Sequence, residues 1–218
     1  MLKLFVVGPS VGYARWIKNK ELVDKIEDAE LIMFTGGQDI NPKIYGCEAH
    51  HSTYFSRDRD KFELNAYRQI RPDQLCIGIC RGAQLACALN GGILVQDVTN
   101  HWIGGTHTMS RCSDIDMDDI LDITSLHHQM MYPYDMPKRD YTLMYVSTNQ
   151  RSSHYEGDKI TEKQISKLNQ IGEPEVVLFH KEGNPRFLAI QGHPEMMYEN
   201  SETVNQFNKI LLKLLHNA

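Results

Sequence analysis

Residues 75–85 read Leu-Cys-Ile-Gly-Ile-Cys-Arg-Gly-Ala-Gln-Leu. The short apolar run predicts a buried strand, a helix follows, and Cys80 stands at the sharp turn between them. The spacing G-x-C-x-G is the thiol counterpart of the nucleophile elbow G-x-S-x-G, in which small residues let strand and helix pack closely. The helix N-terminus favours the thiolate form of Cys80, and the backbone N–H of Arg81 points to where an oxyanion would form.

A second stretch near the end of the sequence supplies a candidate base. Residues 187–191 read as a strand that delivers His193, and Glu195 follows two positions later. In a Cys–His–Glu arrangement, His193 takes the thiol proton and returns it to a leaving amine, while Glu195 fixes the imidazole tautomer. This hypothesis requires that Cys80 and His193 meet in space, which the spacing alone does not show.

Six stretches together carry a family resemblance. They are G-I-C-R-G-A-Q at 78–84, G-H-P-E at 192–195, T-G-G-Q-D-I-N-P-K-I-Y-G at 35–46, R-D-R-D-K-F-E at 57–63, N-G-G-I-L-V-Q-D at 90–97 and S-L-H-H-Q at 125–129. Taken together they resemble the class I (triad) glutamine amidotransferases. More narrowly, they resemble the γ-glutamyl hydrolase branch (peptidase C26-like), the relatives of γ-glutamyl-γ-aminobutyrate hydrolase.

The resemblance implies roles for further residues. It places the second oxyanion donor at Gly36-Gly37, with Gly37 as the donor and Gly36 beside the substrate, although a Gly-Gly pair is also a common tight turn. It puts the glutamine moiety near Gln84, but a buried helical glutamine that satisfies a loop carbonyl fits that position equally well. Further substrate-binding candidates border the same pocket: Ser125, His127 and Gln129.

The fold expected from these patterns is a three-layer, flavodoxin-like α/β fold with a mostly parallel central sheet and helices on both faces. Strands are expected at 2–7, 31–34, 75–79, 93–97 and 141–147, with a hairpin of 176–180 and 187–191. Helices are expected at 19–28, 57–70 and 81–89 and after Ser201, so that the chain opens as a βαβ unit. Residues 150–171 are polar and match no part of the family pattern.

Composition limits the classes of protein. At 218 residues we expect a single domain, 1–218, and the net charge of −5 gives no case for nucleic-acid or membrane binding. Five cysteines without a C-x-x-C pair favour reduced thiols and a cytoplasmic location. No cofactor and no metal are expected: the adjacent side chains of His50 and His51 diverge, and the acidic stretch 114–119 lacks the glycine of a calcium loop.

Three functions are considered. The first is hydrolysis of a γ-glutamyl amide, either glutamine or a γ-glutamyl amine, through a γ-glutamyl thioester on Cys80. The second is a free-standing amidotransferase subunit that passes ammonia to a separate synthetase. The third is a non-catalytic binding or redox-sensing protein on the same fold. The expected partner is a small-molecule γ-glutamyl substrate, with a synthetase in the second case; a homodimer is left open.

Overall fold

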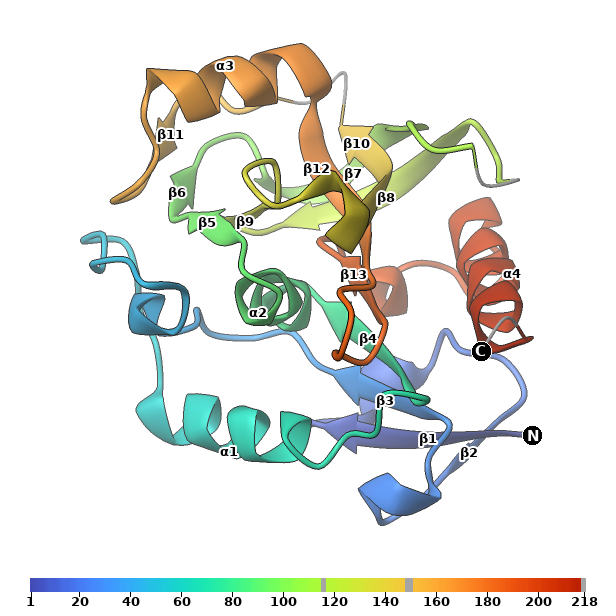
Figure 1. Cartoon of the computed structure of the whole chain (residues 1–218). Coiled ribbons are helices and arrows are strands. Elements are labelled where there is room, and N and C mark those ends of the chain that lie inside the picture. Colours follow the sequence, from blue (N-terminus) through green and yellow to red (C-terminus); the bar gives the residue numbers. More distant parts are fainter. Residues whose placement is uncertain (115–116, 148–150, 217–218) are drawn as a thin grey trace.

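The computed structural model describes residues 1–114, 117–147 and 151–216 (Figure 1). Its main sheet has nine strands in the order β2-β1-β3-β4-β13-β12-β10-β7-β8. The first five are parallel neighbours: β2 (Lys20–Leu22), β1 (Leu2–Val7), β3 (Leu31–Phe34), β4 (Leu75–Ile79) and β13 (Phe187–Ile190). The other four pair antiparallel: β12 (Glu173–Phe179), β10 (Tyr141–Ser147), β7 (Trp102–Arg111) and β8 (Ile120–Leu126).

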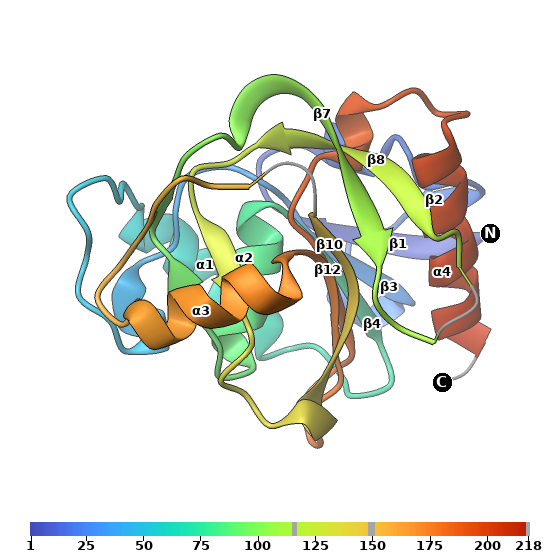
Figure 2. The same ribbon diagram turned by 90° about the horizontal axis from the view of Figure 1, so that it is seen from above.

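Helices cover both faces of this sheet, which confirms the predicted three-layer α/β fold. On one face lie α1 (Arg57–Tyr67) and α2 (Arg81–Leu89), and on the other lies α4 (Glu202–His216) (Figures 1 and 2). Successive side chains of β4 point to opposite faces of the sheet, so the strand contributes to the hydrophobic core on each face. Ile77 and Ile79 belong to the core under α4, whereas Cys76 belongs to the core under α2. A third core lies under α3 (Glu162–Ile171).

Short elements complete the described chain. Two small sheets pair β5 (Ile93–Val95) with β9 (Met130–Tyr132) and β6 (Asp97–Val98) with β11 (Tyr155–Glu156). The 3-10 helices are Val11–Ala14, Ile26–Asp28, Pro42–Tyr45, Lys138–Asp140 and Pro194–Met196. Among the described residues, no helix is long and apolar enough to cross a bilayer.

The predicted helix at 19–28 is wrong. Asn19 adopts a positive φ of 51°, and residues 20–22 then pair with Leu2–Leu4 as an edge strand. Pairing with β1 supplies the backbone hydrogen bonds that a helix would have made, and Leu22 stays 49% exposed. The chain therefore opens as three parallel strands, without the helical crossover that a βαβ unit requires.

Three other boundaries differ from the expectation. Helix α1 ends at Tyr67 rather than at residue 70, and residues 93–97 divide into β5 and the start of β6, both outside the main sheet. The polar stretch 150–171 contains α3, whose N-terminus carries a capping box between Thr161 and Gln164. The expected strands at 2–7, 31–34, 75–79 and 141–147 and the late antiparallel hairpin are confirmed. The acidic stretch 114–119 lies partly outside the described residues.

Candidate active site

The turn after β4 has the strained geometry of a nucleophile elbow. Cys80 has φ 49° and ψ −103°, a conformation that non-glycine residues rarely adopt and that is found mostly at functional sites. A Cβ on Gly78 would lie 2.3 Å from the carbonyl carbon of Gly82, and one on Gly82 would lie 2.2 Å from the Phe34 carbonyl oxygen. Both glycines are therefore required by close packing, as the G-x-C-x-G spacing predicts.

Parallel pairing of β4 with β13 brings the imidazole to the sulfur. Ile79 is paired with Ile190, so the residues that follow the two strands emerge side by side. The backbone N–H of His193 donates to Thr124 Oγ1 at 2.7 Å, which fixes the start of the turn. The structure thus unites two segments that the sequence separates by more than a hundred positions.

The His193 ring is held on one side by a carboxylate. Its Nδ1 lies 2.7 Å from Glu195 Oε1, which leaves Nε2 for the thiol of Cys80. Burial opposes the charged imidazole, but hydrogen bonds with Cys80 and Glu195 outweigh burial and raise the pKa of His193 to about 10. All three side chains are less than 10% exposed. An imidazole held by a carboxylate in this way can accept the proton of a neighbouring thiol.

The loop after β3 passes directly beside this pair. A Cβ on Gly36 would lie 3.1 Å from His193 Cε1 and 3.0 Å from the Tyr13 ring. Gly37 has φ 138° and lines the pocket together with Cys80. Arg59 fixes this loop, since its Nη2 donates to the carbonyl oxygen of Gly36 at 2.7 Å.

A buried network of charged side chains holds the start of α2, directly after Cys80, against α1. The guanidinium of Arg81 is fully buried and donates to Asp60 Oδ1 and Glu63 Oε2, each at 2.8 Å, and to Gln38 O at 2.8 Å. Glu63 also accepts from Arg59 Nε at 2.9 Å. The network ties α1 to the loop 35–39 and to the elbow, the two segments expected to flank an oxyanion. The sequence pattern marks the stretch 57–63 but indicates no role for Arg59.

Cys80 opens into a pocket of about 300 Å³. The lining residues are Gly37, Gln38, Asp39, Tyr54, Cys80, Gln84, Trp102, Leu126, His127, His128 and Gln129. No lysine or arginine is among them. Trp102 and Tyr54 are 70% and 74% exposed at the rim, and Asp39 Oδ1 lies 3.0 Å from His128 Nε2. Trp102, Asp39 and His128 had no predicted site role, because their positions in the sequence do not show that they share a pocket.

The predicted substrate-binding residues fall into two groups. Gln84, His127 and Gln129 line the pocket, and they are linked through the carbonyl oxygen of Gln129. That oxygen accepts from Gln84 Nε2 and from His127 Nδ1, each at 3.0 Å, so Gln84 satisfies a loop carbonyl as the alternative interpretation held. Burial lowers the pKa of His127 well below its usual value. Ser125 is turned away, since its Oγ donates to His101 O at 2.9 Å.

Comparison with known proteins shows the family to which the chain belongs. The family profile described as Peptidase C26 matches residues 15–138, which is more than half of the chain. The chain belongs to the peptidase C26 family. The predicted membership of the class I glutamine amidotransferase superfamily is confirmed by this match together with similar proteins and structures.

Among curated proteins, this peptidase C26 chain is similar to the glutamine amidotransferase-like protein YvdE homolog of Lactococcus lactis subsp. cremoris. The two are 40% identical over 80 residues, 36% of this chain and 39% of that protein. A protein of Mycobacterium tuberculosis described as a glutamine amidotransferase is 33% identical over 81 residues, 35% of this chain and 26% of its length. The matches thus span about two fifths or less of these relatives.

Solved structures share the fold over nearly the whole chain. A Thermoplasma acidophilum protein described as part of a GMP synthase superposes with a TM-score of 0.61 at 17% identity, covering 100% of this chain and 95% of that chain. A glutamine amidotransferase of Thermotoga maritima gives 0.53 at 15% identity, covering 98% and 94%. At such identities the structural similarity establishes the α/β fold alone. The family match, in turn, places the chain among glutamine amidotransferase-like proteins.

Proposed function

We propose that this protein hydrolyses a γ-glutamyl amide through a γ-glutamyl thioester on Cys80. The observation that carries the proposal is Cys80 at a strained elbow that opens into the pocket, with the hydrogen-bonded pair His193 and Glu195 delivered by the neighbouring strand. A buried cysteine in a purely structural role would not need the positive φ of Cys80 or an imidazole–carboxylate partner.

In the proposed first step, the thiolate of Cys80 attacks the side-chain carbonyl carbon of the γ-glutamyl group. A carbon–sulfur bond forms, and the carbonyl electrons move onto oxygen. The protonated His193 then gives its proton to the departing nitrogen as the carbon–nitrogen bond breaks, which releases ammonia or an amine. Water enters, His193 takes one of its protons, and the hydroxide cleaves the thioester to release glutamate and restore the thiol.

The oxyanion of both tetrahedral intermediates is assigned to the backbone N–H groups of Gly37 and Arg81. Arg81 follows Cys80 directly, and Gly37 lines the same pocket as Cys80. The side chain of Arg59 holds the loop at Gly36, and the buried side chain of Arg81 holds the elbow. Preorganised donors of this kind contribute roughly 3 kcal/mol each to the transition state. The chemistry requires no cofactor.

A variant series tests the proposal. Cys80→Ala and Cys80→Ser are expected to abolish turnover of glutamine and γ-glutamyl amines while the unfolding midpoint stays near that of the parent. Cys112→Ala, which removes an exposed thiol, is the matched control and should stay active. Whole-protein mass spectrometry after treatment with a diazo-ketone glutamine analogue should show one adduct that Cys80→Ala lacks. An active Cys80→Ala protein would refute the proposal, and a parent protein without any adduct would favour the non-catalytic alternative.

A second candidate role uses the same chemistry to supply ammonia to a separate synthetase. It is supported by the full-length likeness to the Thermoplasma protein, whose description names a synthase. Robust hydrolysis of γ-glutamyl amines by the isolated chain supports the first role. Glutamine turnover that is low alone and rises when a partner protein is added supports the second.

A further inference from the structure

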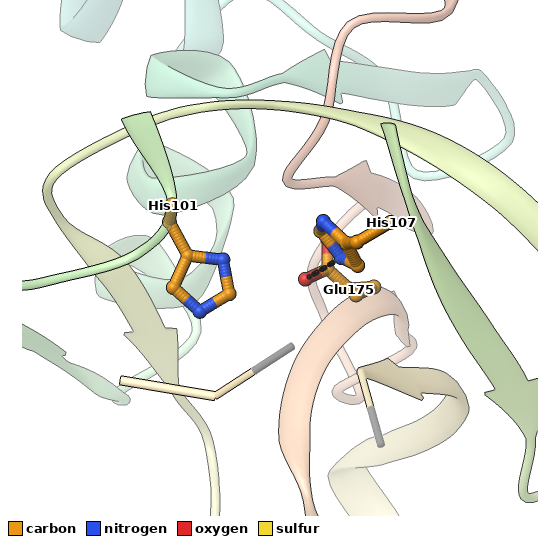
Figure 3. A group of neighbouring side chains, drawn as sticks. All are labelled: His101, His107 and Glu175. Atoms are coloured by element: carbon orange, nitrogen blue, oxygen red, sulfur yellow. Dashed lines mark hydrogen bonds and ion pairs between the residues drawn. The ribbon is translucent and has the colours of Figure 1, made fainter. Parts of the chain in front are cut away.

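Behind the pocket wall lies a buried cluster of histidines and glutamates that the proposed chemistry does not use. The ring of His127, which lines the pocket, stacks on His101 with 4.6 Å between centroids. His101 precedes β7 and His107 lies within it, and both face Glu173 and Glu175 at the start of β12 (Figure 3 shows His101, His107 and Glu175).

Two histidine–carboxylate contacts build this cluster. His107 Nε2 lies 2.8 Å from Glu175 Oε1, and His101 Nε2 lies 2.9 Å from Glu173 Oε2. One potential ligand atom from each of His101, His107 and Glu175 falls within 4.8 Å of the other two. All four side chains are at least 95% buried.

The cluster contains polar atoms that lack a protein partner. His107 Nδ1 and Glu175 Oε2 are both buried without a hydrogen-bond partner among the described residues. A buried polar atom left unsatisfied costs about 1–3 kcal/mol, so such atoms call for an explanation such as a bound ion. Two adjacent, incompletely satisfied side chains in one group favour a ligand that both can share.

We propose that His101, His107 and Glu175 bind a divalent transition-metal cation of the zinc class. Two imidazole nitrogens and one carboxylate oxygen are a common zinc donor set, which leaves a fourth position for water or a further oxygen. Ligand atoms of a tetrahedral zinc site stand roughly 3.4 Å apart, given bonds of about 2.0–2.1 Å. The potential ligand atoms of His101, His107 and Glu175 lie within 4.8 Å of one another, so small side-chain movements could bring them to the distances of a zinc site.

Glu173 orients one of the proposed ligands, His101, through a hydrogen bond. Its Oε2 accepts from His101 Nε2, and its Oε1 accepts from Ser152 N and from the Tyr155 hydroxyl, each at 2.7 Å. A carboxylate held in this way fixes the proton of His101 on Nε2 and leaves the Nδ1 lone pair for a metal. Ser125 Oγ lies 3.3 Å from His101 Nδ1 and donates its proton to the His101 carbonyl oxygen, so a metal bound at Nδ1 would replace the contact with Ser125.

The charges also balance. A bound divalent cation would match the charge of the two buried carboxylates, Glu173 and Glu175.

A second group of candidate ligands provides a control. His50, Asp97 and Glu156 also lie within 4.8 Å of one another, but they are only partly buried, and the Glu156 side chain is 50% exposed. Surface clusters of this kind take up metal weakly. The two sites share no residue, so variants can separate them.

The test uses the full-length chain freed of metal by a chelator. Zinc uptake is measured by competition with a chromophoric chelator, by elemental analysis and by the unfolding midpoint. We expect one tightly held zinc per chain and, at a free zinc concentration 100 times the Kd, a rise in midpoint of about 5–10 °C. Cobalt bound in the same place should give the intense visible absorption of a four-coordinate site.

Variants decide which residues hold the metal. Glu175→Gln, which keeps the side-chain shape, should remove tight binding, and Glu173→Gln should weaken it about 10- to 100-fold. His50→Ala should leave tight binding unchanged. The proposal is overturned if the parent protein takes up no zinc, if His50→Ala alone removes binding, or if cobalt shows only the weak absorption of a six-coordinate ion. Should Glu175→Gln not fold, the Glu173→Gln affinity and the parent cobalt spectrum still decide.

Discussion

Replacement of Glu63 by glutamine tests how the buried charge network supports the elbow. The carboxylate of Glu63 is fully buried between two arginines. It accepts from Arg59 Nε at 2.9 Å, from Arg81 Nη2 at 2.8 Å and from Arg81 Nε at 3.1 Å. Glu63→Gln keeps the size of the side chain but removes the negative charge that both guanidinium groups share.

The expected loss follows from these contacts. Removing one partner of a buried ion pair typically costs 3–5 kcal/mol, because the other charge stays buried without compensation. Asp60 still pairs with Arg81 Nη2 at 2.8 Å, so we expect the lower part of this range, about 3 kcal/mol. For a protein of this size, that loss lowers the unfolding midpoint by roughly 6–12 °C.

The assay is urea unfolding of the parent and variant, followed by circular dichroism at constant pH. Glu48→Gln is the matched control, because Glu48 pairs with Lys43 on the surface with 75% of its side chain exposed; its effect should stay below about 1 kcal/mol. Equal unfolding free energies for Glu63→Gln and Glu48→Gln would show that the network does not hold the fold. A loss confined to turnover would mean that it only positions the loop at Gly36.

Three further outcomes are expected. Gly82→Ala should destabilise the fold by about 1–3 kcal/mol, because its Cβ would lie 2.2 Å from Phe34 O, whereas Gly105→Ala, which meets open space, should not; equal urea midpoints would contradict this. The raised pKa of His193, about 10 against an ordinary 6.5, stabilises the fold fully below pH 6.5. The unfolding midpoint should therefore fall as pH rises through about 10, and a flat profile would refute the coupling. Because Trp102 lies exposed at the pocket rim, Trp102→Ala should raise KM for γ-glutamyl amines with large amine groups and leave kcat nearly unchanged. Equal effects on plain glutamine would exclude a contact between Trp102 and the amine group.

The elbow and the strand that leads to His193 could be predicted because close packing and burial constrain short stretches of sequence. Gly78 and Gly82 are dictated by close contacts, and the strand before His193 is uniformly apolar. The helix predicted at 19–28 was wrong because three apolar residues at helical spacing are too few to define a packed helix face. Its backbone satisfied its hydrogen bonds on the edge of β1 instead.

Other features depend on contacts that a single sequence does not display. The role of Arg59 arises from its approach to the Gly36 carbonyl, 23 positions away, and that of Glu173 from its approach to His101, 72 positions away. The helix α3 did leave a local signal, the threonine and glutamine of its capping box, within an otherwise polar stretch.

The central place of β13 has a consequence during synthesis. It is the last strand of the sheet to be made, yet it inserts between β4 and β12. Until more than a hundred residues beyond Cys80 have left the ribosome, one edge of β4 stays open and His193 is absent from the site. A nascent or prematurely terminated chain therefore exposes an apolar strand edge, a surface for chaperones to cover, and the site of the proposed hydrolysis is incomplete until the sheet has closed.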